Sequence, residues 1–300
     1  MLFNYQIKMQ TLSIRWTFDP EIFSIGPLHV RYYGLCFVMA FVVSYIIFQK
    51  IFKREKLPIP LLDKLSFNVF FSVLIGARLG HCFFYEPAYY LANPIKIFAV
   101  WEGGLASHGA AIGILIGLWW FCYKNKKQFL WIMDRIAIVV SISGCFVRFG
   151  NLMNSEIYGH PTTLPWGFEF VRSLQWHMPP INEQPCHPTQ IYEALSYLLL
   201  FFLLWYLYRK HLQKLNRGTL FGIFLILLFT ARFLIEYVKE TQVEFEQGMA
   251  LNMGQLLSIP FIIAGIVLLL WSIMYGKPDD SLDSVKSTPP KVVTKPKNKK

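Results

Sequence analysis

Charged residues are scarce in this chain of 300 residues. They make up 16% of the sequence, whereas a soluble globular protein carries about 25%. Hydrophobic residues make up 54%, and 27 of the residues are phenylalanine. This composition excludes an ordinary soluble domain and is typical of a polytopic membrane protein.

Several motifs are also missing. The five cysteines form no CxxC pair, so the sequence predicts neither a disulfide framework nor a metal site. No GxSxG or HExxH segment occurs, so serine hydrolase and zinc protease mechanisms have no support. Nothing indicates a haem, flavin or nucleotide site, and we expect no cofactor. Residues 1–17 lack a continuous apolar core, so we expect no cleavable signal peptide.

Long apolar runs are abundant. Seven are long enough to cross a bilayer, which takes about 20 residues each. They span residues 24–50, 66–85, 104–123, 131–150, 189–208, 218–238 and 254–275. The sequence therefore predicts an all-α membrane protein with seven transmembrane helices.

The positive charges are distributed unevenly between the loops. Three alternate loops hold eleven of them: Lys53, Arg54, Lys56, Lys64, Lys124, Lys126, Lys127, Arg209, Lys210, Lys214 and Arg217. The other three loops hold one each, namely Lys96, Arg172 and Lys239. By the positive-inside rule the N-terminus lies outside and the C-terminus in the cytoplasm. The net charge of +11 is then mainly a topology signal, and we expect no nucleic-acid partner.

Two segments differ in composition from the apolar runs. Residues 151–188 form the longest connection and contain six prolines, which predicts a small ordered head on the outer face. Residues 277–300 are rich in Lys, Pro and Ser, which is typical of a disordered tail. We therefore expect a membrane domain over 1–276 that includes the head, followed by a basic cytoplasmic tail.

The segment GCFVRFGNLMNSEIYG, residues 144–159, places an arginine at the end of an apolar run. An ionisable residue at this depth is costly and usually functional. Arg148, Asn151 and Asn154 recur every three residues, so they face one cavity if the helix continues. The guanidinium matches the geometry of a phosphate; the alternative is a structural pair of Arg148 with Glu156.

A histidine lies among glycines in WEGGLASHGAAIG, residues 101–113. Gly103 and Gly104 precede His108, and glycine lets either another helix or a ligand approach the backbone. His108 is either a structural residue or a general base that takes a proton from a thiol or hydroxyl. In the preceding run, Arg78 either faces the same ligand or pairs with a carboxylate to fix packing.

The later runs contribute further polar groups. His187, Gln190 and Glu193 fall on one side of the helix that begins at Pro188. Arg232 and Glu236 are spaced i, i+4, so they pair with each other, or Glu236 holds Arg232 towards a ligand. At the other membrane face, Asp134 and Arg135 are interpreted as a packing pair.

By this topology, the polar groups gather in the outer half of the membrane or at its outer surface. They are Tyr33, Arg78, His108, Arg148, Glu156, Glu193, Arg232 and Glu236. Three arginines with few carboxylates at this level favour an anionic ligand, and a phospholipid headgroup is the nearest one.

Seven segments resemble, in order, the motifs of the prolipoprotein diacylglyceryl transferase family. They are FSIGPLHVRYYGL, GARLGH, WEGGLASHGAAIG, RFGNLMNSEIYG, HPTQIYE, ARFLIEY and NMGQLLSIP, and they cover residues 25–275. Two positions depart from the family pattern, because Val147 and Ala110 stand where the family usually has glycine. Neither change removes a polar group.

The resemblance implies a reaction and its partners. The family transfers diacylglycerol from phosphatidylglycerol to the lipobox cysteine of a preprolipoprotein, which begins lipoprotein maturation. The products are a thioether and glycerol phosphate. No metal or cofactor is needed, and the reaction takes place at the outer side of the bacterial cytoplasmic membrane.

The resemblance also implies roles for individual residues. His108, Arg148 and Arg232 are the implied catalytic residues, with His108 as base and the arginines on the phosphate. The residues implied to bind phosphatidylglycerol with Arg148 are Tyr33, Asn151, Glu156, Gly159 and Glu236. The supporting residues are Arg78, Gly103, Gly104, Asn154, His187, Gln190 and Glu193. His187 and the lipid phosphate remain alternative bases.

The main rival is a non-enzymatic transporter or scramblase of an anionic lipid. Such proteins usually show internal repeats and broken helices at mid-membrane. No internal repeat is present in this sequence, and the polar groups gather at one membrane face.

Overall fold

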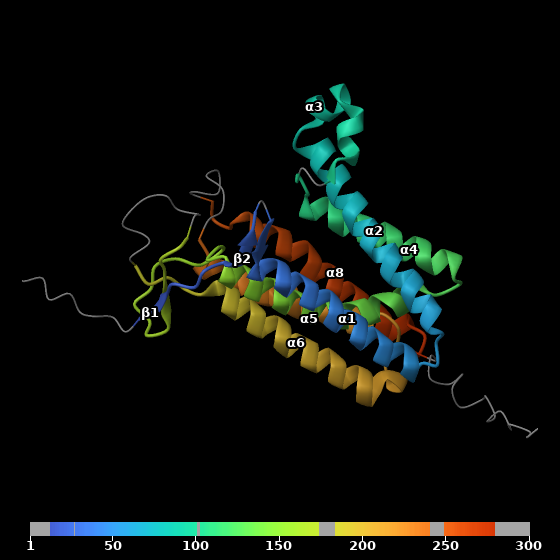
Figure 1. Ribbon diagram of the computed structural model, residues 1–300. Helices are drawn as coiled ribbons and strands as arrows, with labels where there is room; N and C mark the ends of the chain where they lie inside the picture. Colours follow the sequence, from blue (N-terminus) through green and yellow to red (C-terminus); the bar gives the residue numbers. More distant parts are fainter. Residues whose placement is uncertain (1–12, 27, 101–102, 174–183, 241–248, 280–300) are drawn as a thin grey trace, which may run out of the picture. The chain divides into compact units, whose positions relative to one another are not determined.

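The structure is a computed structural model that describes residues 13–26, 28–100, 103–173, 184–240 and 249–279. It is mainly helical (Figure 1). Contacts group the chain into two compact units. Unit 1 comprises residues 1–46, 134–210 and 218–275, and unit 2 comprises 47–133, 211–217 and 276–300. Each unit is described by itself.

Six helices in the described part of the chain are long and apolar enough to cross a membrane. They are α1 (Tyr32–Arg54), α2 (Ile59–Phe84), α5 (Phe129–Met153), α6 (Thr189–His211), α7 (Thr219–Ile235) and α8 (Met253–Tyr275). The chain is therefore a multi-pass membrane protein. The expected span at 104–123 corresponds to α4 (Ser107–Lys124), which is not among the six. Seven spans remain a prediction.

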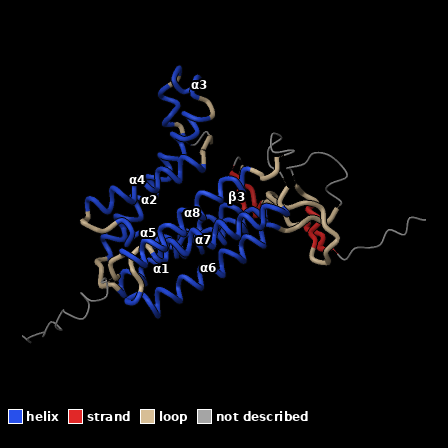
Figure 2. Tube along the Cα trace, turned by 180° about the vertical axis from the view of Figure 1, so that it is seen from behind, coloured by secondary structure: helices blue, strands red, loops and turns tan. Residues whose placement is uncertain are grey.

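In unit 1, the helices α5, α6, α7 and α8 and the first part of α1 lie alongside one another (Figures 1 and 2). Gly222 and Gly265 allow α7 and α8 to pack closely, since a Cβ at Gly265 would lie 2.9 Å from the Cβ of Leu225. Asp134 on α5 accepts hydrogen bonds from the backbone N–H groups of Gly218 (2.7 Å) and Phe221 (2.9 Å). Asp134 thus caps the N-terminus of α7, which gives it a packing role.

Four short strands in the described residues gather at one end of the unit 1 helices (Figure 2). β1 (Ser13–Trp16) pairs in parallel with β4 (Gly167–Phe170), and β2 (Glu21–Ile25) forms a hairpin with β3 (Leu28–Arg31). The all-α expectation is therefore wrong for these segments. The expected first span begins at Tyr32 rather than at residue 24, because the hairpin occupies its start.

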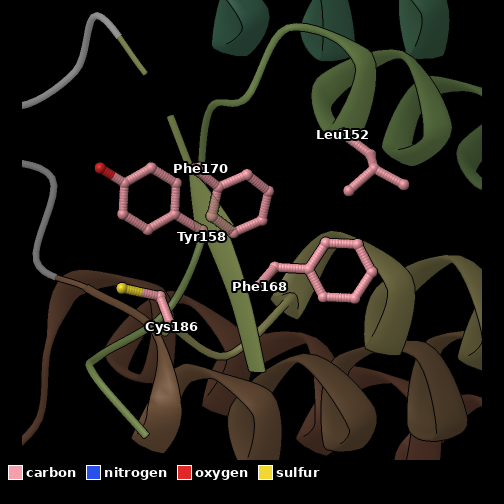
Figure 3. Packing of buried hydrophobic residues seen from close by; sticks show 5 residues of the cluster. All are labelled: Leu152, Tyr158, Phe168, Phe170 and Cys186. Carbon is pink, nitrogen blue, oxygen red and sulfur yellow. The ribbon is translucent and has the colours of Figure 1, made fainter. Parts of the chain in front are cut away.

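The described parts of residues 151–188 form an ordered substructure with a small core of their own. Figure 3 shows this core, in which Tyr158, Phe168, Phe170, Leu152 and Cys186 are all buried. The rings of Tyr158 and Phe170 stack with centroids 4.8 Å apart. The indole N–H of Trp16 on β1 also donates to the Leu152 carbonyl at 3.2 Å, so the N-terminal strand is part of this substructure.

In unit 2, α2 and α4 pack against each other at glycines. The connection between them contains α3 (Pro87–Ala92) and η1 (Pro94–Phe98). A Cβ at Gly80 would lie 2.6 Å from the Cα of Gly109, and one at Gly76 would lie 2.8 Å from the Cα of Gly113. This is small-residue packing of the kind found between membrane helices. The glycine after His108 therefore admits another helix.

The first residues of the predicted tail are ordered. Lys277 accepts a hydrogen bond from the backbone N–H of Arg217 at 3.0 Å, and the N–H of Asp279 donates to Leu215 at 3.1 Å. These contacts join residues 277–279 to the α6–α7 connection. Residues 280–300 lie outside the described part, so a disordered tail stays a prediction.

Candidate functional site

The arginine of the 144–159 segment lies in the last turns of α5, which continues to Met153. Arg148 therefore shares a face with Asn151, and its Nη1 donates to Asn151 Oδ1 at 3.3 Å. Its Nε lies 2.9 Å from Glu193 Oε2 on α6. The alternative pairing of Arg148 with Glu156 is not formed. Arg148 is only 15% exposed, so this is a mostly buried ion pair.

Glu156 instead accepts hydrogen bonds from two amides. Asn151 Nδ2 donates to its Oε1 at 2.8 Å, and Asn154 Nδ2 donates to the same oxygen at 3.3 Å. Past the end of α5 the chain turns sharply, with φ values of 52° at Ser155 and 61° at Ile157. Such angles cost about 1–3 kcal/mol each for residues other than glycine, and they cluster at functional sites.

The start of α6 holds this turn in place. Gln190 Nε2 donates to the Glu156 carbonyl at 2.6 Å, and Thr189 Oγ1 donates to the Ile157 carbonyl at 2.9 Å. Gln190 is fully buried, yet its Oε1, like Asn154 Oδ1, has no partner among the described residues. Buried polar atoms are normally paired, so these two oxygens mark a place where a polar ligand or water fits.

A second cation lies behind Glu193. Lys239 is 3% exposed, and its Nζ lies 3.3 Å from Glu193 Oε1 and 3.6 Å from Glu236 Oε2. Arg148, Glu193, Lys239 and Glu236 therefore form a continuous ion-pair chain. Sequence reasoning missed Lys239, which counted there only as a single outer-loop charge. The one available signal was its position seven residues after Arg232.

The expected pairing of Arg232 with Glu236 does not form. The α-helix α7 ends at Ile235, and a 3-10 turn, η5 (Glu236–Val238), follows. The N–H of Glu236 still donates to the Arg232 carbonyl, so helical spacing continues through Glu236. The Glu236 carboxylate pairs with Lys239 instead. Within the described part of the chain, Arg232 is half-buried and makes no ion pair.

Tyr33 lies in the first turn of α1, and its ring packs on Gly150 of α5. A Cβ at Gly150 would lie 2.9 Å from Tyr33 Cδ2. The charges of Glu156 and Arg148 both act on the Tyr33 phenol. The structure therefore brings Tyr33, Arg148, Asn151 and Glu156 together.

Gly159 holds the junction between the head and the end of α7. It forms a β-bridge with Lys239, and its N–H donates to the His187 carbonyl at 2.8 Å. A Cβ there would lie 2.8 Å from both His187 Cβ and Thr189 Cγ2 and would overlap the Val238 carbonyl. Close packing on all sides explains why this position holds glycine.

His187 lies in the head beside the start of α6. Its Nδ1 lies 3.2 Å from the hydroxyl of Tyr192, which also accepts a hydrogen bond from Trp166 Nε1 at 2.9 Å. Burial lowers the pKa of His187, and the nearby His160 lowers it further. His187 is therefore neutral at pH 7.

In unit 2, Arg78 is occupied by backbone carbonyls. Its guanidinium donates to Lys96 (2.6 Å), Ile97 (2.9 Å) and Gly103 (2.5 Å), and it also lies over the Tyr90 ring. Within the described residues Arg78 makes no ion pair with a carboxylate, and its partners there are backbone carbonyls. It fixes the connection between α2 and α4.

The two glycines before His108 serve the same connection. Gly103 and Gly104 have φ values of 86° and 71°, a left-handed conformation that favours glycine. This conformation turns both carbonyls towards Arg78. His108 then follows in the first turn of α4 with an exposed side chain.

Comparison with known proteins gives a consistent result. The family model described as prolipoprotein diacylglyceryl transferase matches residues 20–271. Phosphatidylglycerol–prolipoprotein diacylglyceryl transferase of Tolumonas auensis is 46% identical over 258 residues, which cover 86% of this chain and 96% of that protein. The protein of the same name from Porphyromonas gingivalis is 46% identical over 265 residues (86% and 94%), and that from Bacteroides fragilis is 43% identical over 279 residues (89% and 96%).

Proposed function

Because the chain belongs to the prolipoprotein diacylglyceryl transferase family, we propose that the polar cluster around Arg148, together with Arg232, is its phosphatidylglycerol site. The protein is a membrane transferase that moves a diacylglyceryl group from phosphatidylglycerol to a prolipoprotein, the first step of lipoprotein maturation. The proposals concern which residues act, on which atoms, and at which side of the membrane.

The chemistry is a displacement at the glycerol carbon that carries the phosphodiester. The thiolate of the lipobox cysteine attacks this carbon, a C–S bond forms, and the C–O bond to phosphate breaks. The electron pair of that bond leaves with glycerol phosphate, and the thiol proton goes to a base. A free thiol has a pKa near 8.5 and attacks as thiolate, so the enzyme must supply a base and stabilise the departing phosphate.

Arg148 is the first proposed ligand of the lipid phosphate. Glu193 and Asn151 engage part of its guanidinium, and the rest of its five-donor fork remains for a ligand. Arg232, which has no ion pair among the described residues, is the second phosphate ligand. The unpaired oxygens of Gln190 and Asn154 accept hydrogen bonds from the headgroup hydroxyls or from ordered water.

Tyr33, Asn151 and Glu156 orient the headgroup in this proposal. Their support is that two amides hold the Glu156 carboxylate beside Arg148, where it can accept a hydrogen bond from a glycerol hydroxyl. Gly159 acts indirectly, because it allows the junction that places Lys239. Glu236 likewise acts through Lys239 rather than by holding Arg232.

His108 is the proposed base. Its support is an exposed imidazole in the first turn of α4, on a connection that Arg78 fixes through several carbonyls. His187 is a weaker choice, because its Nδ1 already faces the Tyr192 hydroxyl.

We place the protein in the bacterial cytoplasmic membrane with seven spans, α4 being the seventh. The N-terminus and head lie outside, the C-terminus lies in the cytoplasm, and the site opens to the outer leaflet. The support is the distribution of Lys and Arg between the loops. Asp134 and the polar cluster at Arg148 lie near opposite ends of α5.

One assay tests the proposal. The purified protein is reconstituted in phosphatidylglycerol vesicles with a lipobox peptide, and lipidated peptide and released glycerol phosphate are measured. The wild type should form both products in equal amounts. Neither product should form with a Cys→Ser peptide or with vesicles that lack phosphatidylglycerol. A transporter or scramblase would release no glycerol phosphate.

A further inference from the structure

Lys239 is the most deeply buried cation of the ion-pair chain, and the proposed function has not yet given it a role of its own. It is 3% exposed. An unpaired ammonium at this depth would be strongly destabilising, so its partners define what it does. Those partners are one oxygen of Glu193 and one oxygen of Glu236.

The backbone fixes the direction of the Lys239 side chain. Residues on either side pair with the head, because His160 N–H donates to the Val238 carbonyl at 2.9 Å and Glu240 N–H donates to the Tyr158 carbonyl at 3.3 Å. A β-bridge joins Lys239 itself to Gly159. The ammonium is therefore held between the two carboxylates by an antiparallel backbone junction.

The two oxygens of Glu193 are divided between two cations. Oε2 lies 2.9 Å from Arg148 Nε, and Oε1 lies 3.3 Å from Lys239 Nζ. A carboxylate facing an arginine alone tends to form two parallel hydrogen bonds with one edge of the guanidinium. Here Lys239 donates to the second oxygen. The contact of Arg148 Nε with Glu193 Oε2 is an ion pair that lacks hydrogen-bond geometry.

We propose that Lys239 is a positioning residue that limits the Arg148–Glu193 pair to one oxygen and so keeps donors of Arg148 available for the lipid phosphate. Without Lys239, Glu193 turns both oxygens to Arg148 and competes with the phosphodiester. The inference rests on the proposed function, in which Arg148 binds that phosphate.

The test uses the full-length protein in phosphatidylglycerol vesicles with a lipobox peptide. Lys239→Met should lower kcat/KM about 10²-fold, the size expected from misplacing one catalytic group. Lys239→Arg, which keeps the charge, should retain most of the activity. Adding Glu193→Gln to Lys239→Met should restore most of the loss, since a neutral amide cannot make a bidentate ion pair with Arg148.

The double variant also guards against a failure to fold. It removes one charge of each sign, so it leaves no uncompensated carboxylate at Glu193. If Lys239→Met does not fold, the comparison passes to Glu193→Gln alone and the double variant, which should have equal kcat/KM. A kcat/KM of the double variant that is tenfold below that of Glu193→Gln alone would overturn the proposal, because Lys239 would then act on something other than Glu193.

The outcomes separate this inference from the function it rests on. Wild-type activity in Lys239→Met, alongside an inactive Arg148→Ala, refutes the role of Lys239 and leaves the phosphate site standing. Full activity in Arg148→Ala refutes the phosphate site itself. A loss in Lys239→Met that Glu193→Gln does not relieve shows a purely structural ion pair and also refutes the proposal.

Discussion

Replacing Arg148 by lysine should separate catalysis from stability. Lysine keeps the positive charge next to Glu193, but it loses the planar fork and cannot reach Asn151 and a phosphate at once. Removing one partner of a buried ion pair normally costs about 3–5 kcal/mol because it leaves an unpaired charge. In this protein the lysine keeps a cation beside Glu193 and Lys239 remains 3.3 Å from its other oxygen, so Arg148→Lys should cost clearly less stability than that.

The catalytic effect of the same change should be much larger. Loss of one preorganised donor to a developing oxyanion costs about 10²–10³-fold in kcat, and the fork supplies more than one donor. We therefore expect Arg148→Lys and Arg148→Ala to release less than about a hundredth of the wild-type glycerol phosphate. Thermal unfolding in detergent should show a midpoint close to that of the wild type for the lysine variant.

Two results would contradict this reasoning. Near-normal product release by Arg148→Lys would mean that charge alone suffices and that the guanidinium geometry is irrelevant. A large fall in the unfolding midpoint of Arg148→Lys would mean that Lys239 does not compensate Glu193. A matched control is Arg172→Lys, an exposed arginine of the head that should lose neither activity nor stability.

Three further predictions follow from the structure. His108→Gln should leave the protein folded and reduce lipidated peptide about 10²-fold or more; normal activity would move the base elsewhere. Gly159→Ala should lower the unfolding midpoint because the added Cβ overlaps backbone, whereas Gly34→Ala, which meets nothing within 4 Å, should not; equal midpoints would contradict the close packing. Because burial and His160 lower the pKa of His187, the unfolded state binds a proton there first as pH falls. Stability should thus drop below about pH 6.5, and His187→Asn should reduce that drop unless another group causes it.

The polar segment at residues 148–156 was the part of the site that sequence periodicity could predict. Arg148 and Asn151 share a face because α5 continues to Met153. The way Glu156 folds back onto Asn151 could not be predicted, because it needs positive φ at Ser155 and Ile157. Neither is a residue type that sequence rules assign to such a conformation.

Helix positions were predictable to within a few residues where the apolar run was uninterrupted. The observed α8 begins one residue before the predicted span and ends at the same residue, Tyr275. Predictions were wrong where local pairing ended a helix. After η5 the backbone becomes extended at Lys239, where helical spacing carries no information, and Glu236 pairs with Lys239 rather than with Arg232.

Arg78 shows a different limit. The sequence placed it in an apolar run and left a ligand or a carboxylate as its partner. Its partners are backbone carbonyls of a connecting loop, and no sequence pattern reports which carbonyls a loop will turn inward. An arginine in an apolar helix therefore signals a costly group that needs partners, without saying whether they are a ligand or the chain itself.

The structure also changes the argument for an anionic ligand. Sequence reasoning relied on three arginines with few carboxylates, but Arg78 is occupied by the chain and Glu156, Glu193 and Glu236 match the remaining cations in number. Charge balance alone therefore no longer favours a phosphate. What favours it is how the partners are assigned: Lys239 contacts two of the carboxylates, and amides hold the third. Among the described residues, Arg232 and part of Arg148 are left without a matching anion, so the proposed phosphate site would lose its selectivity without Lys239.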